Sequence, residues 1–160
     1  MTKNITVLIA LDYDQTAEKV AKEGFAIASS MNADIILMHV ASEPVFYSSV
    51  GYSPITGFLG YINMKNIKFD STTEPKIIAQ FYLDHFKQHL GNDKIKTHVG
   101  EGDFAESILE TAKTKHADAI VIGSHSHNWI ENLLMGSVTE KVLKLSTIPL
   151  IIIPVGKSDK

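Results

Sequence analysis

The amino-acid sequence predicts an α/β fold: a doubly wound, Rossmann-like, five-stranded parallel sheet with helices on both faces. Two observations predict it. Apolar runs of strand length alternate with amphipathic stretches of helix length along the chain. The apolar runs are also nearly continuous in Val, Ile and Leu, which is typical of strands buried on both faces. A chain of 160 residues fits one domain with a sizeable core, so we predict a single domain over 1–160.

The elements follow from the periodicity of the apolar residues. The predicted strands are Ile5–Leu11, Asp34–Val40, Lys94–Val99, Ala117–Ile122 and Pro149–Pro154. The predicted helices are Thr16–Met31, Pro75–Leu90, Phe104–His116 and Val138–Leu145. The helix residues expected to face the core are Val20, Phe25, Ala28, Ile78, Phe81, Leu83, Phe86, Ile108, Leu109, Ala112, Val138, Val142 and Leu145.

One long connection interrupts this alternation. Residues 42–73 have no sustained period but contain Tyr47, Tyr52, Phe58 and Tyr61. A connection of this length is usually a functional lid, a partner surface or disordered. Because disordered segments are poor in aromatic residues, we interpret 42–73 as a lid-like insertion.

Composition and charge exclude several classes of function. The net charge is −3 and no dense basic block occurs, so no nucleic-acid partner is expected. The N-terminal apolar run Ile5–Leu11 is too short for a signal peptide or for a membrane span, which takes about 20 residues. We therefore expect no membrane association and a cytoplasmic location. The absence of cysteine excludes disulfides, thiolate metal sites and thiol nucleophiles.

Ligands of doubly wound sheets bind beyond the carboxyl ends of the strands, where the strand order reverses. The residues that follow the predicted strands there are Asp12, His39–Ala41, Gly100–Asp103 and Gly123–His127. Asp12 could hydrogen-bond a ribose hydroxyl, bind a metal, or cap the next helix, a role that Asp14 could also take. The residues alone leave these roles open.

The stretch Gly123–Thr139, "GSHSHNWIENLLMGSVT", leads from a strand into a helix. It fits a capping box with Ser137 as N-cap and Glu140 reaching back. A helix start has unpaired amides and a partial positive charge, so it stabilises an anion. Gly136 would permit close backbone approach, and Ser137 and Thr139 would add hydroxyl donors. A capped turn that binds only water is the alternative.

Two histidine pairs have spacings compatible with metal binding. His125 and His127 lie in the turn, and His85 and His89 lie four apart on a predicted helix. Neither pair has a nearby third ligand in sequence, so we predict no metal site. We expect the helix pair on the solvated surface and the turn pair beside phosphates.

Gly100–Ala105 matches the dinucleotide fingerprint G-x-G-x-x-A between a strand and a helix. The match lacks the acid that should follow about 20 residues later, and it does not follow the first strand. We expect instead that Asp103 caps the next helix, with Glu106 at N3.

Taken together, several motifs resemble the ATP-binding universal stress proteins. Gly123–Ser126, nine further residues and then Gly136-Ser137 are similar to the signature G-x2-G-x9-G-[S/T] of that family. The similarity extends over "VLIALDYDQTAEKVAKEGFAIA", "MHVASEP", "EGDFAESILETAKTKHADAIVIGSHS" and "GSVTEKVLKLSTIPLIIIPV". The resemblance implies the adenine nucleotide alpha hydrolase-like variant of the fold and an adenine-nucleotide ligand, ATP or else AMP or ADP, with Mg²⁺.

The resemblance also implies residue roles. Asp12 would hold the ribose, the backbone of Val40 would meet the adenine, and Ala10 would line the base pocket. The phosphates would be wrapped by Gly123, Ser124, His125, Ser126, His127, Asn128, Gly136, Ser137 and Val138, with Thr139 beside them. Ser126 replaces the second glycine of the signature. It would impose a conformational cost if this position needs a positive φ, or its hydroxyl would donate to a phosphate.

Three functions remain open on this basis. The first is a nucleotide-binding regulatory module of the stress response, read by an unknown regulatory protein partner. The second is a slow ATPase or phosphotransferase, which needs a positioned base and a cation on the γ-phosphate. Because Gly123–Thr139 contains no Lys or Arg, binding is favoured over turnover and no catalytic residue is predicted. The third is a member that has lost nucleotide binding and acts through protein contacts.

The closing strand Pro149–Pro154 is unusually apolar, and the last strand of such a sheet is often an edge. An exposed apolar edge favours pairing with a symmetric copy. The resemblance agrees, because the family commonly dimerises through this strand, and we predict a homodimer.

Overall fold

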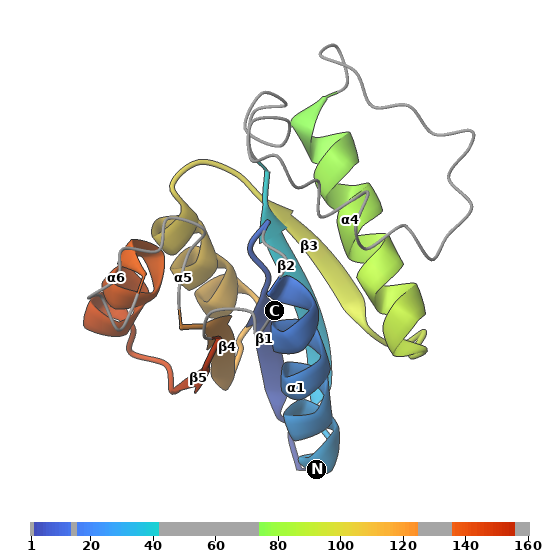
Figure 1. Cartoon of the computed structure of the whole chain (residues 1–160). Helices are drawn as coiled ribbons and strands as arrows, with labels where there is room; N and C mark the ends of the chain where they lie inside the picture. Colours follow the sequence, from blue (N-terminus) through green and yellow to red (C-terminus); the bar gives the residue numbers. More distant parts are fainter. Residues whose placement is uncertain (1, 14–15, 42–73, 125–135, 156–160) are drawn as a thin grey trace.

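The computed structural model describes residues 2–13, 16–41, 74–124 and 136–155 of the chain. Strands and helices alternate along these residues, as Figure 1 shows. The strands are β1 (Thr6–Ala10), β2 (Asp34–Val40), β3 (Lys96–Gly100), β4 (Ala119–Gly123) and β5 (Leu150–Ile153). The helices are α1 (Ala17–Ser30), α4 (Pro75–Leu90), α5 (Phe104–Thr114) and α6 (Ser137–Leu145).

The predicted α/β class and its elements are confirmed. β2 and α4 have the predicted bounds, and the other elements differ from prediction by at most two residues at either end. The predicted lid-like insertion, 42–73, lies outside the described residues.

All five strands are parallel, in the order β3-β2-β1-β4-β5. From β1 the chain adds β2 and β3 on one side, and it then returns to the other side of β1 to add β4 and β5. The strand order therefore reverses between β1 and β4. In a doubly wound sheet this reversal opens a crevice at the carboxyl ends of the strands.

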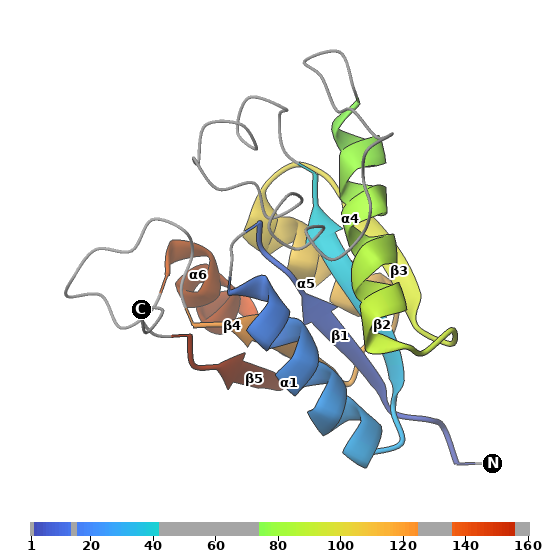
Figure 2. The same ribbon diagram turned by 45° about the vertical axis from the view of Figure 1, so that its right-hand side comes forward.

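The two faces of the sheet carry separate cores, each covered by two helices (Figure 2). Alternation along β1 turns Val7 and Ile9 toward α1 and α4, and Leu8 and Ala10 toward α5 and α6. Val7, Leu8 and Ile9 are fully buried, as the central strand of a sheet covered on both faces should be.

The helix residues predicted to face the core do so with one exception. Phe25, Phe81, Leu109 and Val138 are partly buried, and the others are buried. Leu145 is the exception, at 56% exposed. It is the last residue of α6, where the chain leaves the helix for β5.

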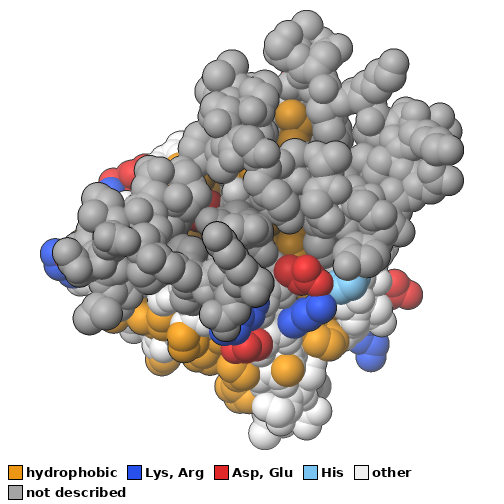
Figure 3. All heavy atoms as spheres, viewed as in Figure 1, with side chains coloured by type: hydrophobic (Ala, Val, Ile, Leu, Met, Phe, Trp, Pro, Cys, Tyr) orange, Lys and Arg blue, Asp and Glu red, His pale blue; other side chains and the backbone are white. Residues whose placement is uncertain are grey.

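The described surface seen in Figure 3 mixes acidic and basic side chains with apolar ones. Several of the charges pair along single helices, such as Lys22 with Glu18 and Lys144 with Glu140. None of the helices within the described ranges combines the length and the apolarity that crossing a bilayer requires.

The turn between β3 and α5 explains the glycines of the rejected dinucleotide fingerprint. Gly100 is buried, and a Cβ there would meet the Ser107 hydroxyl and come within 2.6 Å of Met38 Cε. Gly102 has φ +81°, a conformation that favours glycine. Asp103 is the N-cap of α5, because its carboxylate accepts from the Glu106 amide at 2.9 Å, which confirms the predicted cap.

Lys141 of α6 joins this cap. Its Nζ lies 3.1 Å from Asp103 Oδ1 and 3.5 Å from Glu106 Oε1, so it links the starts of α5 and α6. The hydrogen bond from the Glu106 amide and the one from Lys141 lower the pKa of Asp103. This ammonium group is therefore engaged with α5.

Replacing Gly100 with alanine should lower the free energy of unfolding by about 1–3 kcal/mol, because the new methyl group displaces Met38 and Ser107 in a packed core. Urea denaturation measures this loss. The double variant Gly100→Ala/Ser107→Ala should lose less than the sum of the single variants, because one of the two clashing groups is gone. An unchanged midpoint in Gly100→Ala would contradict the close approach.

Candidate functional site

A pocket opens at the carboxyl ends of β1, β2 and β4, where the strand order reverses. Its lining comes from the ends of these three strands and from the starts of α1, α5 and α6. The lining residues are Ala10, Leu11, Asp12, Thr16, Ala17, Val20, Met38, His39, Val40, Phe104, Ile108, Ile122, Gly123, Val138 and Thr139.

Part of the predicted site lines this pocket. The predicted residues in the lining are Ala10, Asp12, Val40, Gly123, Val138 and Thr139. Ser124, Gly136 and Ser137 are described but do not line it. His125, Ser126, His127 and Asn128 lie outside the described residues.

The lining divides into an apolar part and a polar edge. The apolar part comes from both layers of the fold and includes Met38, Val40, Phe104 and Ile122. The polar edge is formed by Asp12, Thr16, His39 and Thr139. Such a pocket suits a ligand with a flat apolar group joined to a polar one.

The end of β2 also presents backbone groups beside the pocket. The bond from the Leu11 amide to the Met38 carbonyl, 2.8 Å, lies just past the last paired residues of β1 and β2. Because successive residues of a strand point their peptide groups to alternate sides, Val40 directs its N–H and C=O to the same side as Met38. These groups therefore lie past the end of β1, beside the pocket.

Asp12 is half-buried at the polar edge, directly after β1. Its Oδ1 accepts from the amide of Tyr13 at 2.7 Å. The N-cap of α1 is Thr16, so Asp12 does not cap this helix, and Asp14 lies outside the described residues.

The backbone around Asp12 is held by two side chains from other elements. The carbonyl of Leu11 accepts from His39 Nδ1 at 2.8 Å, and the carbonyl of Asp12 accepts from the Tyr82 hydroxyl at 2.8 Å. Sequence reasoning identified His39 as a strand-end residue but missed Tyr82. The apolar periodicity of α4 gives no sign of a hydroxyl that bonds 70 residues away.

Burial lowers the pKa of His39, against smaller opposing effects of the hydrogen bond to Leu11 and of the Asp12 charge. The ring is therefore neutral at pH 7. Since a carbonyl can only accept, Nδ1 carries the hydrogen in the tautomer that we assign.

The two ends of the predicted phosphate-binding stretch are fastened to each other and to β5. The Gly136 amide donates to the Ser124 carbonyl at 2.9 Å. The Ser124 hydroxyl accepts from the Val155 amide at 2.9 Å, and the Thr139 hydroxyl donates to the Gly123 carbonyl at 2.7 Å. This hydrogen of Thr139 is used within the fold, which corrects the expectation that Thr139 adds a donor to the pocket.

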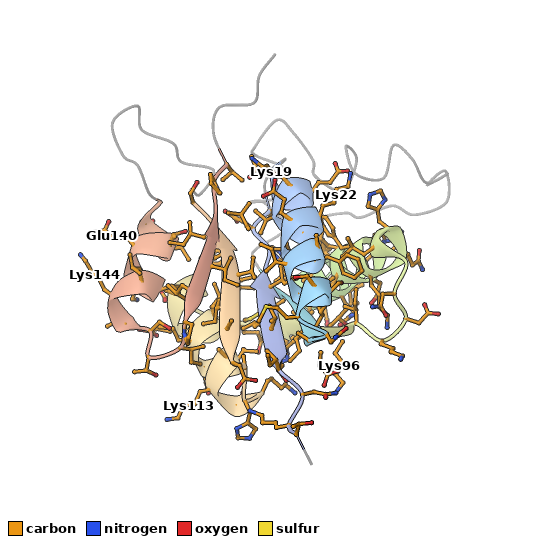
Figure 4. The ribbon with its side chains drawn as sticks, turned by 90° about the horizontal axis from the view of Figure 1, so that it is seen from below. Lys19, Lys22, Lys96, Lys113, Glu140 and Lys144 are labelled. Atoms are coloured by element: carbon orange, nitrogen blue, oxygen red, sulfur yellow. The ribbon has the colours of Figure 1, made fainter. Side chains whose placement is uncertain are left out.

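The start of α6 differs from the predicted capping box. Gly136, not Ser137, is the N-cap, with φ −70° and no side-chain cap. Glu140 does not reach back to the helix start; its carboxylate pairs with Lys144 at 2.9 Å, and Figure 4 shows both on the outer side of α6. Because the first bond of α6 runs from the Glu140 amide to the Gly136 carbonyl, the amides of 137–139 precede intrahelical bonding.

No cluster of three or more potential metal ligands occurs within the described ranges. The expected surface position of His85 is wrong, because its Nδ1 is satisfied by the Phe81 carbonyl at 2.7 Å and its ring packs 4.1 Å from that of Phe81. With Nδ1 satisfied inside α4 and its face packed on Phe81, the ring is buried. His89 remains at the surface, 3.7 Å from Glu18.

Comparison with known proteins gives consistent matches. The universal stress protein family model matches residues 3–154. The universal stress protein MJ0577 of Methanocaldococcus jannaschii is 28% identical over 151 residues, covering 92% of this chain and 93% of that protein. Universal stress protein YxiE of Bacillus subtilis is 28% identical over 149 residues, covering 92% and 97%.

Solved structures match the fold as well. The structure of MJ0577 has a TM-score of 0.68 at 25% identity and covers 98% of this chain and 100% of its own. A universal stress protein in complex with cAMP has a TM-score of 0.62 at 19% identity, covering 97% and 100%. One from Archaeoglobus fulgidus in complex with dAMP has a TM-score of 0.56 at 17% identity, covering 95% and 98%. With the family model spanning nearly all of the sequence, the chain belongs to the universal stress protein family.

Proposed function

We propose that this chain binds an adenine nucleotide, ATP or else AMP or ADP, and acts as a regulatory module of the stress response. The observation that carries the proposal is the pocket at the reversal of strand order, with an apolar interior and Asp12 at its polar edge. The family supports it, since two structures of similar fold hold cAMP and dAMP.

The lining suggests how such a ligand would be held. The adenine would lie against the apolar wall, with the Val40 peptide groups at its edge. Asp12 would accept from the ribose hydroxyls, because an ionised carboxylate is a hydrogen-bond acceptor. The phosphates would lie near the amides of 137–139 and the residues 123–128.

Mg²⁺ would enter with the phosphates. Asp12, the one acidic side chain among the described lining residues, is assigned to the ribose, so Mg²⁺ would be held by the phosphates together with waters. Bound Mg²⁺ would offset phosphate charge.

Binding fits the lining better than turnover does. Phosphoryl transfer needs a cation on the γ-phosphate and a positioned base. The described lining contains no Lys or Arg, and the nearby Lys141 is engaged with Asp103 and Glu106. A slow ATPase using the same pocket is the alternative, with His125 and His127 as its candidate bases. In the regulatory role that we propose, bound nucleotide would change the contacts of the dimer or the segment 42–73. A regulatory protein partner would recognise this change.

Isothermal titration calorimetry should detect ATP binding to the purified chain, and Asp12→Ala should weaken it at least 10-fold, because a charge-assisted hydrogen bond contributes about 1.5–3 kcal/mol. Glu110→Ala, which removes one acid from the exposed side of α5, is the control and should bind as the parent does.

Calorimetry and thermal shift that both stay flat at millimolar ATP, ADP and AMP would sink nucleotide binding and the enzyme alternative together. The third function, that of a family member that acts through protein contacts alone, would then be favoured for this chain. Phosphate release on the timescale of binding would favour the slow ATPase, whereas binding with no phosphate release over hours would favour the regulatory module.

Replacing Ser126 with glycine should tighten ATP binding roughly 5-fold if the motif needs a positive φ there, since the left-handed region costs a non-glycine residue about 1–2 kcal/mol. Ser126→Ala keeps a Cβ but lacks the hydroxyl, so it should bind as the parent does. Weaker binding in both variants would show instead that the hydroxyl is a ligand.

We further propose a homodimer through β5, the edge strand next to β4. The carbonyls of Pro149 and Ile153 accept from β4, so the peptide groups of residues 150 and 152 point to the outer edge. Leu150 and Ile152 are partly buried, which leaves apolar surface along this edge for a second copy.

Light scattering should give a dimer at micromolar concentration for the parent chain and a monomer for Ile152→Pro, which removes an outward N–H without taking a donor from the β4 ladder. Ile152→Ala is the matched control. It loses side-chain packing but keeps the N–H, and should stay dimeric. A monomeric parent chain would refute the dimer.

A further inference from the structure

The backbone at Asp12 is held in an unusual way for a strand end. Past β1, the amide of Leu11 still bonds to the Met38 carbonyl of β2, but the next two carbonyls of the chain bond to side chains. His39 of β2 donates to the first and Tyr82 of α4 to the second, each at 2.8 Å. Side chains thus replace the strand partner where the ladder stops.

These two bonds fix both peptide units that meet at the Cα atom of Asp12. The Leu11 carbonyl belongs to the peptide before it and the Asp12 carbonyl to the peptide after it. With both planes anchored, φ and ψ of Asp12 are set, and with them the direction of its Cα–Cβ bond. The bond from the Tyr13 amide to Oδ1 then orients the carboxylate.

The anchors themselves have little freedom. His39 and Tyr82 are 2% and 1% exposed, and their rings meet edge-on with centroids 4.9 Å apart. The ring of Tyr13 packs against both, at 5.5 Å from His39 and 5.0 Å from Tyr82. Phe86, one turn further along α4, packs edge-on against Tyr82 at 4.9 Å. Rings packed on several sides cannot change rotamer without opening the core.

Building these anchors from two elements matters for a binding site. Asp12 is half-buried, and a carboxylate that must meet ribose hydroxyls has to be held to within about half an ångström. A strand end alone would leave this residue to fray. Because the bonds come from β2 and α4, the packed layer on that face of the sheet holds Asp12 in position.

We propose that Tyr82 and His39 are positioning residues for nucleotide binding, which hold the peptides on either side of Asp12 so that its carboxylate faces the ribose. The inference rests on the proposed function, in that the ribose is the group Asp12 would meet. Neither His39 Nδ1 nor the Tyr82 hydroxyl is assigned a contact with the ligand, because both bond to the backbone.

The test separates ribose recognition from general binding. In calorimetry, Tyr82→Phe should weaken ATP roughly 5-fold, the effect of one net hydrogen bond, and leave 2′,3′-dideoxy-ATP within about 2-fold of the parent. In an Asp12→Ala background the same change should cost nothing further. Thr114→Val, which also removes a hydroxyl that donates to a backbone carbonyl, lies at the far end of α5 and should change neither ligand.

A second pair of variants tests His39. In His39→Asn the side-chain amide can take the place of Nδ1 as donor, whereas His39→Leu has none. The ratio of ATP affinity to dideoxy-ATP affinity should therefore be closer to the parent value in His39→Asn than in His39→Leu. Equal losses for both ligands, or the same loss of Tyr82→Phe when Asp12 is already alanine, would overturn the inference.

A ligand-free measurement keeps this inference separate from the proposed function. By NMR hydrogen exchange, the Tyr13 amide should exchange roughly 5-fold faster in Tyr82→Phe, beyond any change at Leu8, which reports global opening. If the parent chain binds neither nucleotide, the proposed function fails, and the exchange result decides the positioning alone. Unchanged exchange at Tyr13 would overturn it.

Discussion

β1 pairs with β2 on one side and with β4 on the other, and the pocket depends on this double pairing. A strand that is hydrogen-bonded on both edges and covered on both faces must be apolar where it is buried, as the last four residues of "TVLIA" are. The helix that follows β1, α1, lies on one face of the sheet, and the helix that follows β4, α6, lies on the other. The space between the starts of these helices is the crevice, and Asp12 is the first polar residue that β1 can place there.

The end of a parallel strand leaves backbone groups without a ladder partner, and buried groups must be satisfied. On both sides of this pocket side chains do so. His39 and Tyr82 donate hydrogen bonds to the two carbonyls that follow β1, and Thr139 donates to the Gly123 carbonyl at the end of β4. The pocket edge is therefore built from short side-chain-to-backbone bonds, and its shape depends on helix packing as much as on the sheet.

Sequence reasoning was successful where the signal is local and repeated. The period of the apolar residues located every described strand and helix, and the topology of the fold class then placed Asp12 and Val40 at one edge. It failed where a tertiary contact decides. Tyr82 reads as one more ring on an apolar helix face, and the hydrogen bond that distinguishes it joins residues 70 apart. His85 is buried because its neighbour Phe81 supplies both a carbonyl and a packing ring, which spacing alone does not reveal.

The start of α6 shows a different limit. A Ser followed three residues later by Glu predicts a capping box, but Glu140 also has a lysine four residues ahead, and that ion pair is the one that forms. Local patterns that compete for one side chain cannot be ranked from sequence.

The same geometry bears on the serine that replaces the second glycine of the family signature. The described bonds that fasten the two ends of the 123–139 stretch come from Gly123, Ser124, Gly136 and Thr139, and they tie β4 to α6 and to the end of β5. None of these bonds requires a particular residue at 126. These bonds can therefore form with a serine at position 126. The substitution should affect contacts with a ligand rather than the fold. Nucleotide affinity and stability are then separable properties of the 123–139 stretch, and Ser126→Gly should change the first and leave the second in place.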